Sequence, residues 1–155
     1  MQQRHKKTSL ENLKLCKEQL SAALKWLERS YCQCNGIELT RPFSEEDFDK
    51  LENLTSRFAR VTDLLINKMY RAIDLVEFKQ PGSLIDTINN AEKNRLIDSV
   101  DQARTLKDIR NEIAHEYKLE DQKYLFNEVM LETAELLKLS KKAIEYTAKY
   151  ENRDN

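Results

Sequence analysis

Residues 48–76 read FDKLENLTSRFARVTDLLINKMYRAIDLV, and this stretch decides the fold of the chain. Hydrophobic side chains recur in it every three or four residues, which places them on one face of an α-helix. They are Phe48, Leu51, Leu54, Phe58, Val61, Leu65, Met69, Ile73 and Val76. The stripe extends over roughly eight turns, since an α-helix has about 3.6 residues per turn. The pattern therefore predicts one long amphipathic helix.

Local signals mark both ends of this helix. Ser44 precedes the stripe, and its hydroxyl can accept a hydrogen bond from the first free amides of a helix. Three acidic residues follow at positions 45–47, where carboxylates interact favourably with the positive end of the helix dipole. The Pro81-Gly82 pair ends the helix.

Four further helices are predicted on either side of this stretch. They cover about residues 9–34, 83–94 and 121–150, together with a helix that carries the apolar positions from Val100 to Ile113 and is capped by Asp98 or Ser99. The resulting order of long, long, short, medium and long helices is typical of a bundle. We predict an all-α fold, namely an up-and-down helical bundle of four long or medium helices plus one short helix.

Length and composition agree with a single helical domain. The chain has 155 residues, and domains commonly have about 100–200. Only two glycines and two prolines are present, which leaves little room for a turn-rich β fold. We expect a helical domain at residues 9–150, preceded by a disordered basic stub at residues 1–8 and followed by a frayed tail at residues 151–155.

Charge and hydropathy narrow the functional class. The net charge is -1, so no overall basic field steers the chain onto nucleic acid. The first residues lack the apolar core of a signal peptide, and no apolar run is long enough to span a membrane. Three cysteines, Cys16, Cys32 and Cys34, are an odd number and are expected to be reduced thiols without an assigned role. We therefore expect a cytoplasmic protein.

The common cofactor and metal motifs are missing from the sequence. Gly36 and Gly82 cannot form a glycine-rich phosphate loop. The two histidines, His5 and His115, are not paired at metal-ligand spacing, and Cys32-Gln33-Cys34 has no second thiol pair and is interpreted as helix-end packing. We predict neither a cofactor nor a metal.

The polar residues with the most chemical potential are concentrated in RNEIAHEY, residues 110–117. Asn111 and His115 are four residues apart, so they share one face of a helix. Arg110 and Tyr117 are seven apart and also nearly superimpose. Arg110 and His115 are five apart, which separates them by roughly 140° around the helix axis.

These residue types suit cleavage of a phosphodiester without a metal. A guanidinium binds phosphate bidentately and stays charged, and a histidine can transfer a proton near neutral pH. Asn111 can orient the imidazole of His115 or bind a phosphate oxygen. One helix places Arg110 and His115 poorly for a joint action, whereas two copies across a two-fold axis would supply two of each in one cleft. A plainer interpretation is that Arg110 pairs with Glu112 or Asp108 and His115 caps the helix.

The motif resembles that of a known family. Arg110-Asn111-Glu112-Ile113-Ala114-His115 is similar to the R-x(4–6)-H motif of HEPN domains, and His115-Glu116-Tyr117 extends it to R-x(4)-H-x-Y. The longer form resembles HEPN toxins that are paired with minimal nucleotidyltransferase (MNT) antitoxins. HEPN domains are all-α bundles with this motif at the end of a late helix, so the likeness extends over roughly residues 9–150.

The resemblance implies a role for each motif residue. Arg110 and His115 would be the catalytic pair of a metal-independent endoribonuclease toxin that works as a homodimer on RNA, and Asn111 would support the site. Tyr117 would be modified with AMP by the MNT antitoxin, which silences the toxin. Two alternatives stay open: a non-catalytic accessory or substrate-binding subunit of a nucleotidyltransferase, and a plain structural bundle.

Overall fold

The computed structural model describes residues 2–78, 80, 82–115 and 119–151, and all regular structure within these ranges is helical. The elements in chain order are α1 (Gln2–Cys34), α2 (Glu45–Asp63), the π-helix η1 (Leu64–Met69), α3 (Tyr70–Glu77), α4 (Leu84–Lys93), α5 (Val100–Ile113) and α6 (Leu119–Glu151). Because α2, η1 and α3 follow one another without a break, they form one rod. The predicted all-α class is thereby confirmed, with the rod, α1, α5 and α6 as its long and medium helices and α4 as the short one.

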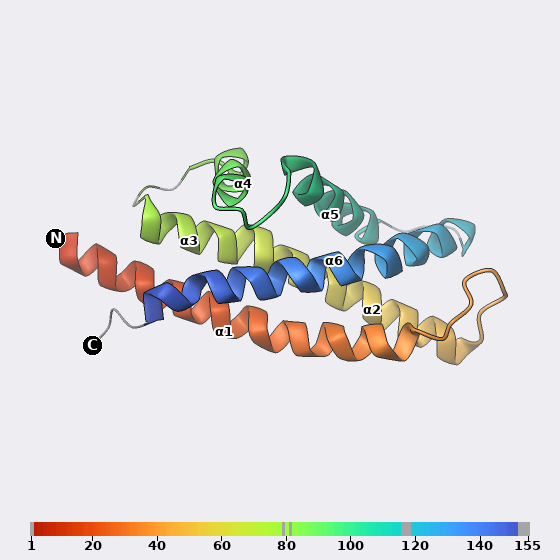
Figure 1. Ribbon diagram of the computed structural model, residues 1–155. Helices are drawn as coiled ribbons and strands as arrows, with labels where there is room; N and C mark the ends of the chain where they lie inside the picture. The colour runs from red at the N-terminus through yellow and green to blue at the C-terminus, as the bar shows by residue number, and fades with distance from the viewer. Residues whose placement is uncertain (1, 79, 81, 116–118, 152–155) are drawn as a thin grey trace.

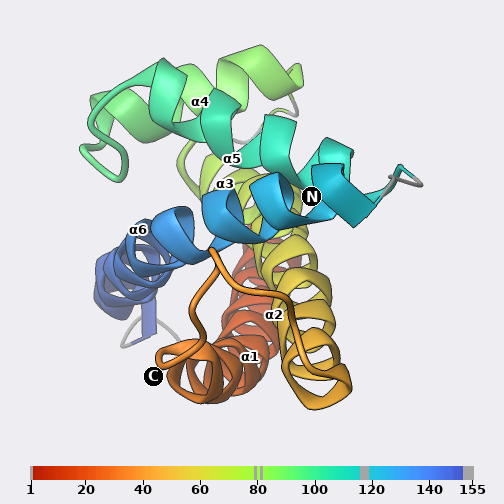
Figure 2. The ribbon, with the colours of Figure 1, turned by 90° about the vertical axis from the view of Figure 1, so that its right-hand side faces the viewer.

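The helices form an elongated bundle in which the long ones lie side by side (Figure 1). Helix α1 contacts α2, α3 and α6 along its length. The end-on view in Figure 2 shows α4 and α5 on one side of this group. Helix α5 contacts α2 and α6, and α4 contacts α3 and α5. This arrangement brings the end of α5, which carries the polar motif, over the rod.

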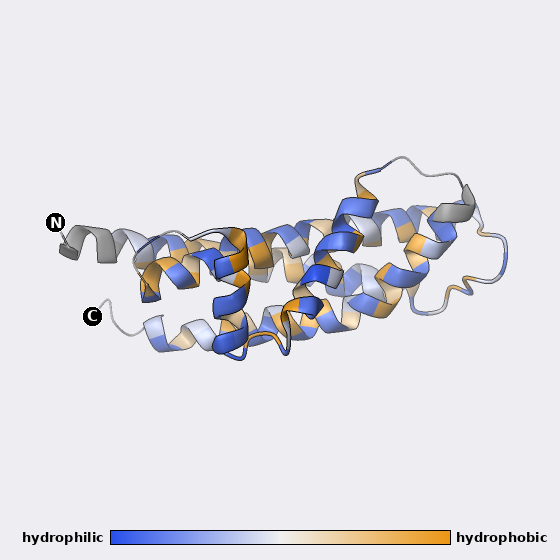
Figure 3. Cartoon of the chain, turned by 90° about the horizontal axis from the view of Figure 1, so that it is seen from above, coloured by the Kyte–Doolittle hydropathy of each residue, from blue (hydrophilic) through white to orange (hydrophobic). Residues whose placement is uncertain are grey.

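The predicted hydrophobic stripe faces the core of the bundle. Most of its members, from Leu51 to Ile73, are at most 1% exposed, and only Phe48 and Val76 at its two ends are partly exposed. Leu20 and Leu27 of α1 and Leu136 of α6 complete the core at 0% exposure. Figure 3 shows the matching alternation of hydrophobic and hydrophilic bands along the helices. Burial of this stripe is the main force that holds the rod in place.

The π-helix η1 is the one feature of the rod that periodicity does not predict. The amide of Tyr70 donates to the carbonyl of Leu65, five residues back, instead of four. A turn closed in this way contains one more residue than an α-helical turn, and π-helical turns occur often at functional sites. The core positions Leu65, Met69 and Ile73 remain buried across it, so the wider turn keeps the stripe on the core side of the rod.

Serine hydroxyls cap three helices. Ser44 Oγ accepts from the amide of Asp47 at 3.1 Å, as predicted for the start of the rod. Ser83 and Asp86 form a reciprocal capping box at the start of α4. Ser99, and not Asp98, caps α5, because its Oγ accepts from the amide of Gln102. The sequence alone did not decide which of these two residues is the cap.

Helix α1 begins at Gln2, seven residues before the predicted start, and thus includes most of the segment expected to be a disordered stub. Glutamine, arginine and lysine are good helix formers, so the helix continues through this polar segment at little cost. At the other end of α1, the buried Cys34 thiol donates to the carbonyl of Lys50 at 3.4 Å, while Cys32 is exposed. In the described part of the chain, no helix is both long and apolar enough to cross a membrane.

Candidate functional site

Three of the four predicted site residues lie in the described part of the chain, and the structure does not bring all three together. Arg110 and Asn111 lie in the last turn of α5, and His115 lies just after the helix ends at Ile113. Tyr117 lies outside the described residues. The site is therefore built from the neighbours of Arg110 and Asn111.

Arg110 is held by Asp63, the last residue of α2. Arg110 Nε donates to Asp63 Oδ1 at 2.8 Å, and Nη2 donates to Oδ2 at 3.0 Å. The two side chains are 33% and 39% exposed. The hydrogen bonds and the charge of Asp63 raise the pKa of Arg110 still further, so the guanidinium is cationic at any working pH. The plainer sequence interpretation expected Glu112 or Asp108 as its partner, whereas the partner is 47 residues earlier in the chain.

The pair with Asp63 fixes the orientation of the guanidinium but does not use all of its hydrogen-bond donors. A guanidinium has five N–H groups in a planar fork, and Asp63 takes two of them along the Nε–Nη2 edge. The Nη1 edge is a second edge of the same plane, and it has the geometry that suits two oxygens of a phosphate. Asp63 thus acts as a positioning residue that orients Arg110.

A polar cavity of about 350 Å³ surrounds Arg110. It is formed between the end of α2, the π-helix and the last two turns of α5. Its lining residues are Thr62, Asp63, Ile66, Asn67, Lys107, Arg110 and Asn111. Two cations, two amides and one carboxylate make this a site with an excess of hydrogen-bond donors and one net positive charge. Such a lining suits an oxyanion.

One wall of the cavity has a buried polar group without a partner. The Thr62 side chain is 1% exposed, and its Oγ1 is one of four buried side-chain polar atoms with no hydrogen-bond partner among the described residues. A buried hydroxyl left unpaired costs roughly 1–3 kcal/mol. Thr62 lines the cavity, and a ligand oxygen that reached the buried Oγ1 could accept its proton. The π-helix begins two residues later, at Leu64, and contributes Ile66 and Asn67 to the same wall.

His115 does not line this cavity. Its side chain is exposed, and its amide donates to the carbonyl of Glu112 at 3.1 Å. Partial burial, followed by the carboxylate of Glu128, raises the pKa of Glu112, and His115 opposes that rise. The imidazole therefore has acidic neighbours. Within one chain, the structure brings Arg110 and Asn111 together and leaves His115 outside their cavity.

A second hollow of about 290 Å³ lies between α4 and α5 and adjoins the first. Leu84, Ile85 and Ile88 of α4 and Val100 of α5 form its apolar wall, and its polar rim consists of Arg104, Lys107, Asp108 and Asn111. Lys107 and Asn111 line both hollows. The two spaces are thus neighbours along one face of α5.

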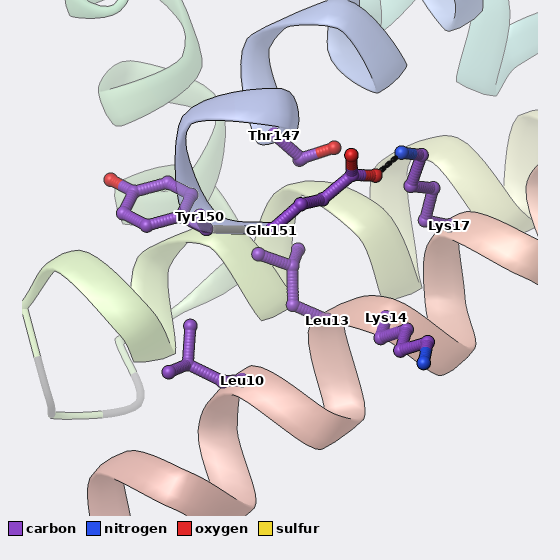
Figure 4. A pocket seen from close by; sticks show the side chains of 7 residues that line it. All are labelled: Leu10, Leu13, Lys14, Lys17, Thr147, Tyr150 and Glu151. Carbon is purple, nitrogen blue, oxygen red and sulfur yellow. Dashed lines mark ion pairs between the residues drawn. The ribbon is translucent and has the colours of Figure 1, made fainter. Parts of the chain in front are cut away.

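A third hollow, of about 340 Å³, lies where the first turns of α1 face the last turns of α6 (Figure 4). Leu10, Leu13 and Lys14 line it, and Lys17 forms an ion pair with Glu151 across it. Arg110, Asn111 and His115 do not line this hollow, and two of its charged residues, Lys17 and Glu151, are paired with each other. Among the described residues, no group of three or more histidine, cysteine or acidic side chains could hold a metal ion.

The sequence did not identify Thr62, Asp63, Asn67 and Lys107 as site residues. The first three belong to the rod and were hidden beside its hydrophobic stripe. Lys107 lies one helical turn before Asn111, so the four-residue spacing was the only available signal. Scans with protein-family models and searches of curated proteins and solved structures found no match to this chain.

Proposed function

We propose that this protein is a metal-independent endoribonuclease of the HEPN toxin type, which binds a phosphate of RNA in the cavity at Arg110. The observation that carries the proposal is the arrangement around the guanidinium. Asp63 fixes one edge of Arg110, while Lys107, Asn111 and Thr62 also line the cavity. The motif R-x(4)-H-x-Y supplies the second half of the argument, because it places a histidine five residues after this arginine.

The proposed reaction is the internal transfer that RNA itself permits. The 2′-oxygen of a ribose bonds to the adjacent phosphorus, and the bond from phosphorus to the 5′-oxygen breaks. One histidine accepts the proton of the 2′-hydroxyl, and another donates a proton to the leaving 5′-oxygen. Arg110 stabilises the charge that accumulates on the phosphoryl oxygens. The products are a 2′,3′-cyclic phosphate and a 5′-hydroxyl.

This scheme requires a homodimer. His115 of one chain lies outside its own Arg110 cavity, so a histidine must reach the phosphate from a facing copy. A two-fold axis would bring two arginines and two histidines into one cleft. Sedimentation equilibrium should therefore show a dimer at tens of micromolar chain, roughly the range in which a specific interface is populated.

Silencing is proposed to act through Tyr117. An MNT-type nucleotidyltransferase would transfer AMP from ATP to the phenolic oxygen and release pyrophosphate. The added phosphate would introduce negative charge next to the motif and compete with RNA for Arg110. Intact-protein mass spectrometry after co-expression with such a partner should show the mass of AMP, and Tyr117→Phe should abolish it.

The decisive test is RNA cleavage in the presence of a chelator. The parent protein should cut RNA and leave 2′,3′-cyclic phosphate ends, and a 2′-deoxy substitution at the cleaved position should prevent this. His115→Ala and Arg110→Ala should each remove cleavage. The matched control is Arg29→Ala, which removes an exposed arginine of α1. Growth arrest on induced expression of the parent, but not of His115→Ala, would extend the result to cells.

A non-catalytic accessory subunit of a nucleotidyltransferase is the second candidate. It is favoured by the carboxylate that already pairs with Arg110 and by the position of His115 outside the cavity. In that case the protein would bind the nucleotidyltransferase and a nucleotide phosphate, yet RNA would remain intact at any protein concentration. Equal growth with the parent and His115→Ala would also favour this candidate.

A further inference from the structure

The hollow between α4 and α5 opens next to the Arg110 cavity without being part of it. The two spaces have Lys107 and Asn111 in common, and they are about 290 and 350 Å³ in volume. Together they fall within the size range of small-ligand sites, which is roughly 300–1,000 Å³. A ligand that occupied both would present one apolar part and one anionic part, joined at Lys107 and Asn111.

The apolar part of the site has an unusual exposure. Ile85, on α4, is 71% exposed although it is a large aliphatic residue, and it forms the wall together with Leu84 and the nearly buried Ile88. Covering such a side chain would remove apolar surface from water. The rim opposite this wall offers hydrogen-bond donors and acceptors from Asn111 and Asp108. An apolar wall with a polar rim suits a flat ring that has apolar faces and hydrogen-bonding edges, as a nucleobase has.

We propose that the α4–α5 hollow binds the base of the ribonucleotide whose phosphate lies at Arg110. This inference rests on the function proposed above, since that function supplies the phosphate. Lys107 and Asn111 then contact the nucleotide where its sugar joins the phosphate, and the base lies against Ile85. Arg104 is also at the rim, where it forms an exposed ion pair with Asp101 at 3.7 Å, and its guanidinium could attract the next phosphate of the RNA.

Two probes that differ only in the base test this proposal. Adenosine 5′-monophosphate and ribose 5-phosphate have the same sugar and phosphate, and calorimetric titration of each onto the full-length protein measures the contribution of the base. We expect the nucleotide to bind about tenfold more tightly, which corresponds to burying roughly 50 Å² of apolar surface. Equal affinity for the two probes would overturn the proposal.

Two substitutions of matched exposure locate the effect. Ile85→Ser should remove the advantage of the nucleotide and leave ribose 5-phosphate binding unchanged. Leu131→Ser is the control, since Leu131 is 70% exposed on α6 and does not line the hollow. The inference would be contradicted if the nucleotide still bound more tightly than ribose 5-phosphate in Ile85→Ser. It would also be contradicted if Leu131→Ser removed this difference in affinity to the same extent. Both side chains are exposed, so folding should be preserved, as thermal unfolding of each variant would verify.

Arg110→Ala separates this inference from the function on which it rests. If both probes bind equally and both are weakened by Arg110→Ala, the phosphate site stands and the base site fails. If neither probe is weakened by Arg110→Ala, the phosphate site itself fails, and with it the nucleotide that the base site was meant to complete.

Discussion

Glu77 and Arg110 each take part in hydrogen bonds between the rod and other helices, and they differ in how much of their hydrogen-bonding capacity the fold uses. Glu77, at the end of α3, accepts from the hydroxyls of Tyr146 and Tyr150 at 2.5 Å each and from Asn94 Nδ2 at 2.8 Å. Its side chain is 15% exposed. Arg110, at the end of α5, is about twice as exposed, and its one side-chain partner among the described residues is Asp63.

The difference separates a structural centre from a candidate binding centre. At Glu77, both carboxylate oxygens are bonded, so the group ties α3, α6 and the end of α4 together and leaves nothing for a ligand. At Arg110, one edge of the guanidinium is fixed by Asp63, and the residue lines a polar cavity to which Thr62 also contributes. A charged residue is a better candidate for function when the fold orients it but does not satisfy it.

The largest effect is expected at Arg110. Arg110→Ala removes the group that we propose stabilises charge in the transition state, so RNA cleavage should fall about 10²–10³-fold, as for the loss of one preorganised donor. Stability should change little, because the two side chains of the pair are 33% and 39% exposed and such pairs contribute at most about 1 kcal/mol. Cleavage rates and urea unfolding of the same preparations measure both. If Arg110→Ala also lost several kcal/mol of stability, Arg110 would be a structural group like Glu77, and the comparison would fail.

The converse is expected at Glu77. Glu77→Ala leaves the hydroxyls of Tyr146 and Tyr150 and the amide of Asn94 without their acceptor, so the free energy of unfolding should fall by roughly 2–3 kcal/mol. Nucleotide binding by the folded fraction should stay as in the parent. The matched control is Glu132→Ala, which removes a half-buried glutamate of α6. A loss of affinity in folded Glu77→Ala would show that the two centres are coupled.

Thr62→Val sharpens the comparison from the side of the cavity. Valine has the same shape as threonine but lacks the hydroxyl, so the unpaired buried Oγ1 disappears. We expect the free energy of unfolding to rise by about 1 kcal/mol and phosphate affinity to fall about fivefold, because a neutral hydrogen bond is worth about 1 kcal/mol. Thermal unfolding with and without ribose 5-phosphate measures both. A variant that is less stable than the parent would mean that the hydroxyl already serves the free fold.

The smallest effect is a pH dependence of stability at Glu77. Burial alone would raise the pKa of Glu77, but the bonds from Tyr146, Tyr150 and Asn94 and the charge of Lys149 together lower it below its ordinary value of 4.5. Its stabilising contribution is therefore complete above pH 4.5 and is lost as the pH falls through the lower pKa of the folded state.

A neighbouring carboxyl works in the opposite direction. Burial raises the pKa of Asp74, so its contribution is complete below pH 3.8 and is lost as the pH rises. Urea unfolding at pH 6 and pH 3.5 should show a smaller loss on acidification in Glu77→Gln than in the parent, because the variant cannot take up this proton. An equal loss in both proteins would assign the acid sensitivity to other groups.

Much of the fold follows from the sequence because burial is periodic. The hydrophobic stripe predicted the rod, and serine followed by a helical pattern predicted its cap at Ser44 and the cap of α5 at Asp98 or Ser99. These signals are local, since each depends on residues within one or two turns. The early start of α1 at Gln2 escaped prediction because a polar segment has no stripe to mark it.

The candidate site was only half predictable. Arg110 and Asn111 are adjacent in one motif, and an arginine next to an asparagine indicates a possible phosphate site. Asp63 orients Arg110 from 47 residues away, and no periodicity links the two positions. The Thr62 hydroxyl is unpaired because of the way the helices pack around it. A single sequence does not reveal that packing. Enzymatic activity, partners and the role of Tyr117 stay predictions.

The π-helix has a consequence for tracing the ancestry of this chain. Its wider turn absorbs one residue, so a version of the rod without it would be one residue shorter between Asp63 and Tyr70 and would keep the same core. In an α-helix, an uncompensated residue rotates everything beyond it by about 100°. An ungapped alignment to such a relative would match the core positions before the π-helix and mismatch those after it. Kinship would then be visible only to a search that allows a single gap in the middle of a helix.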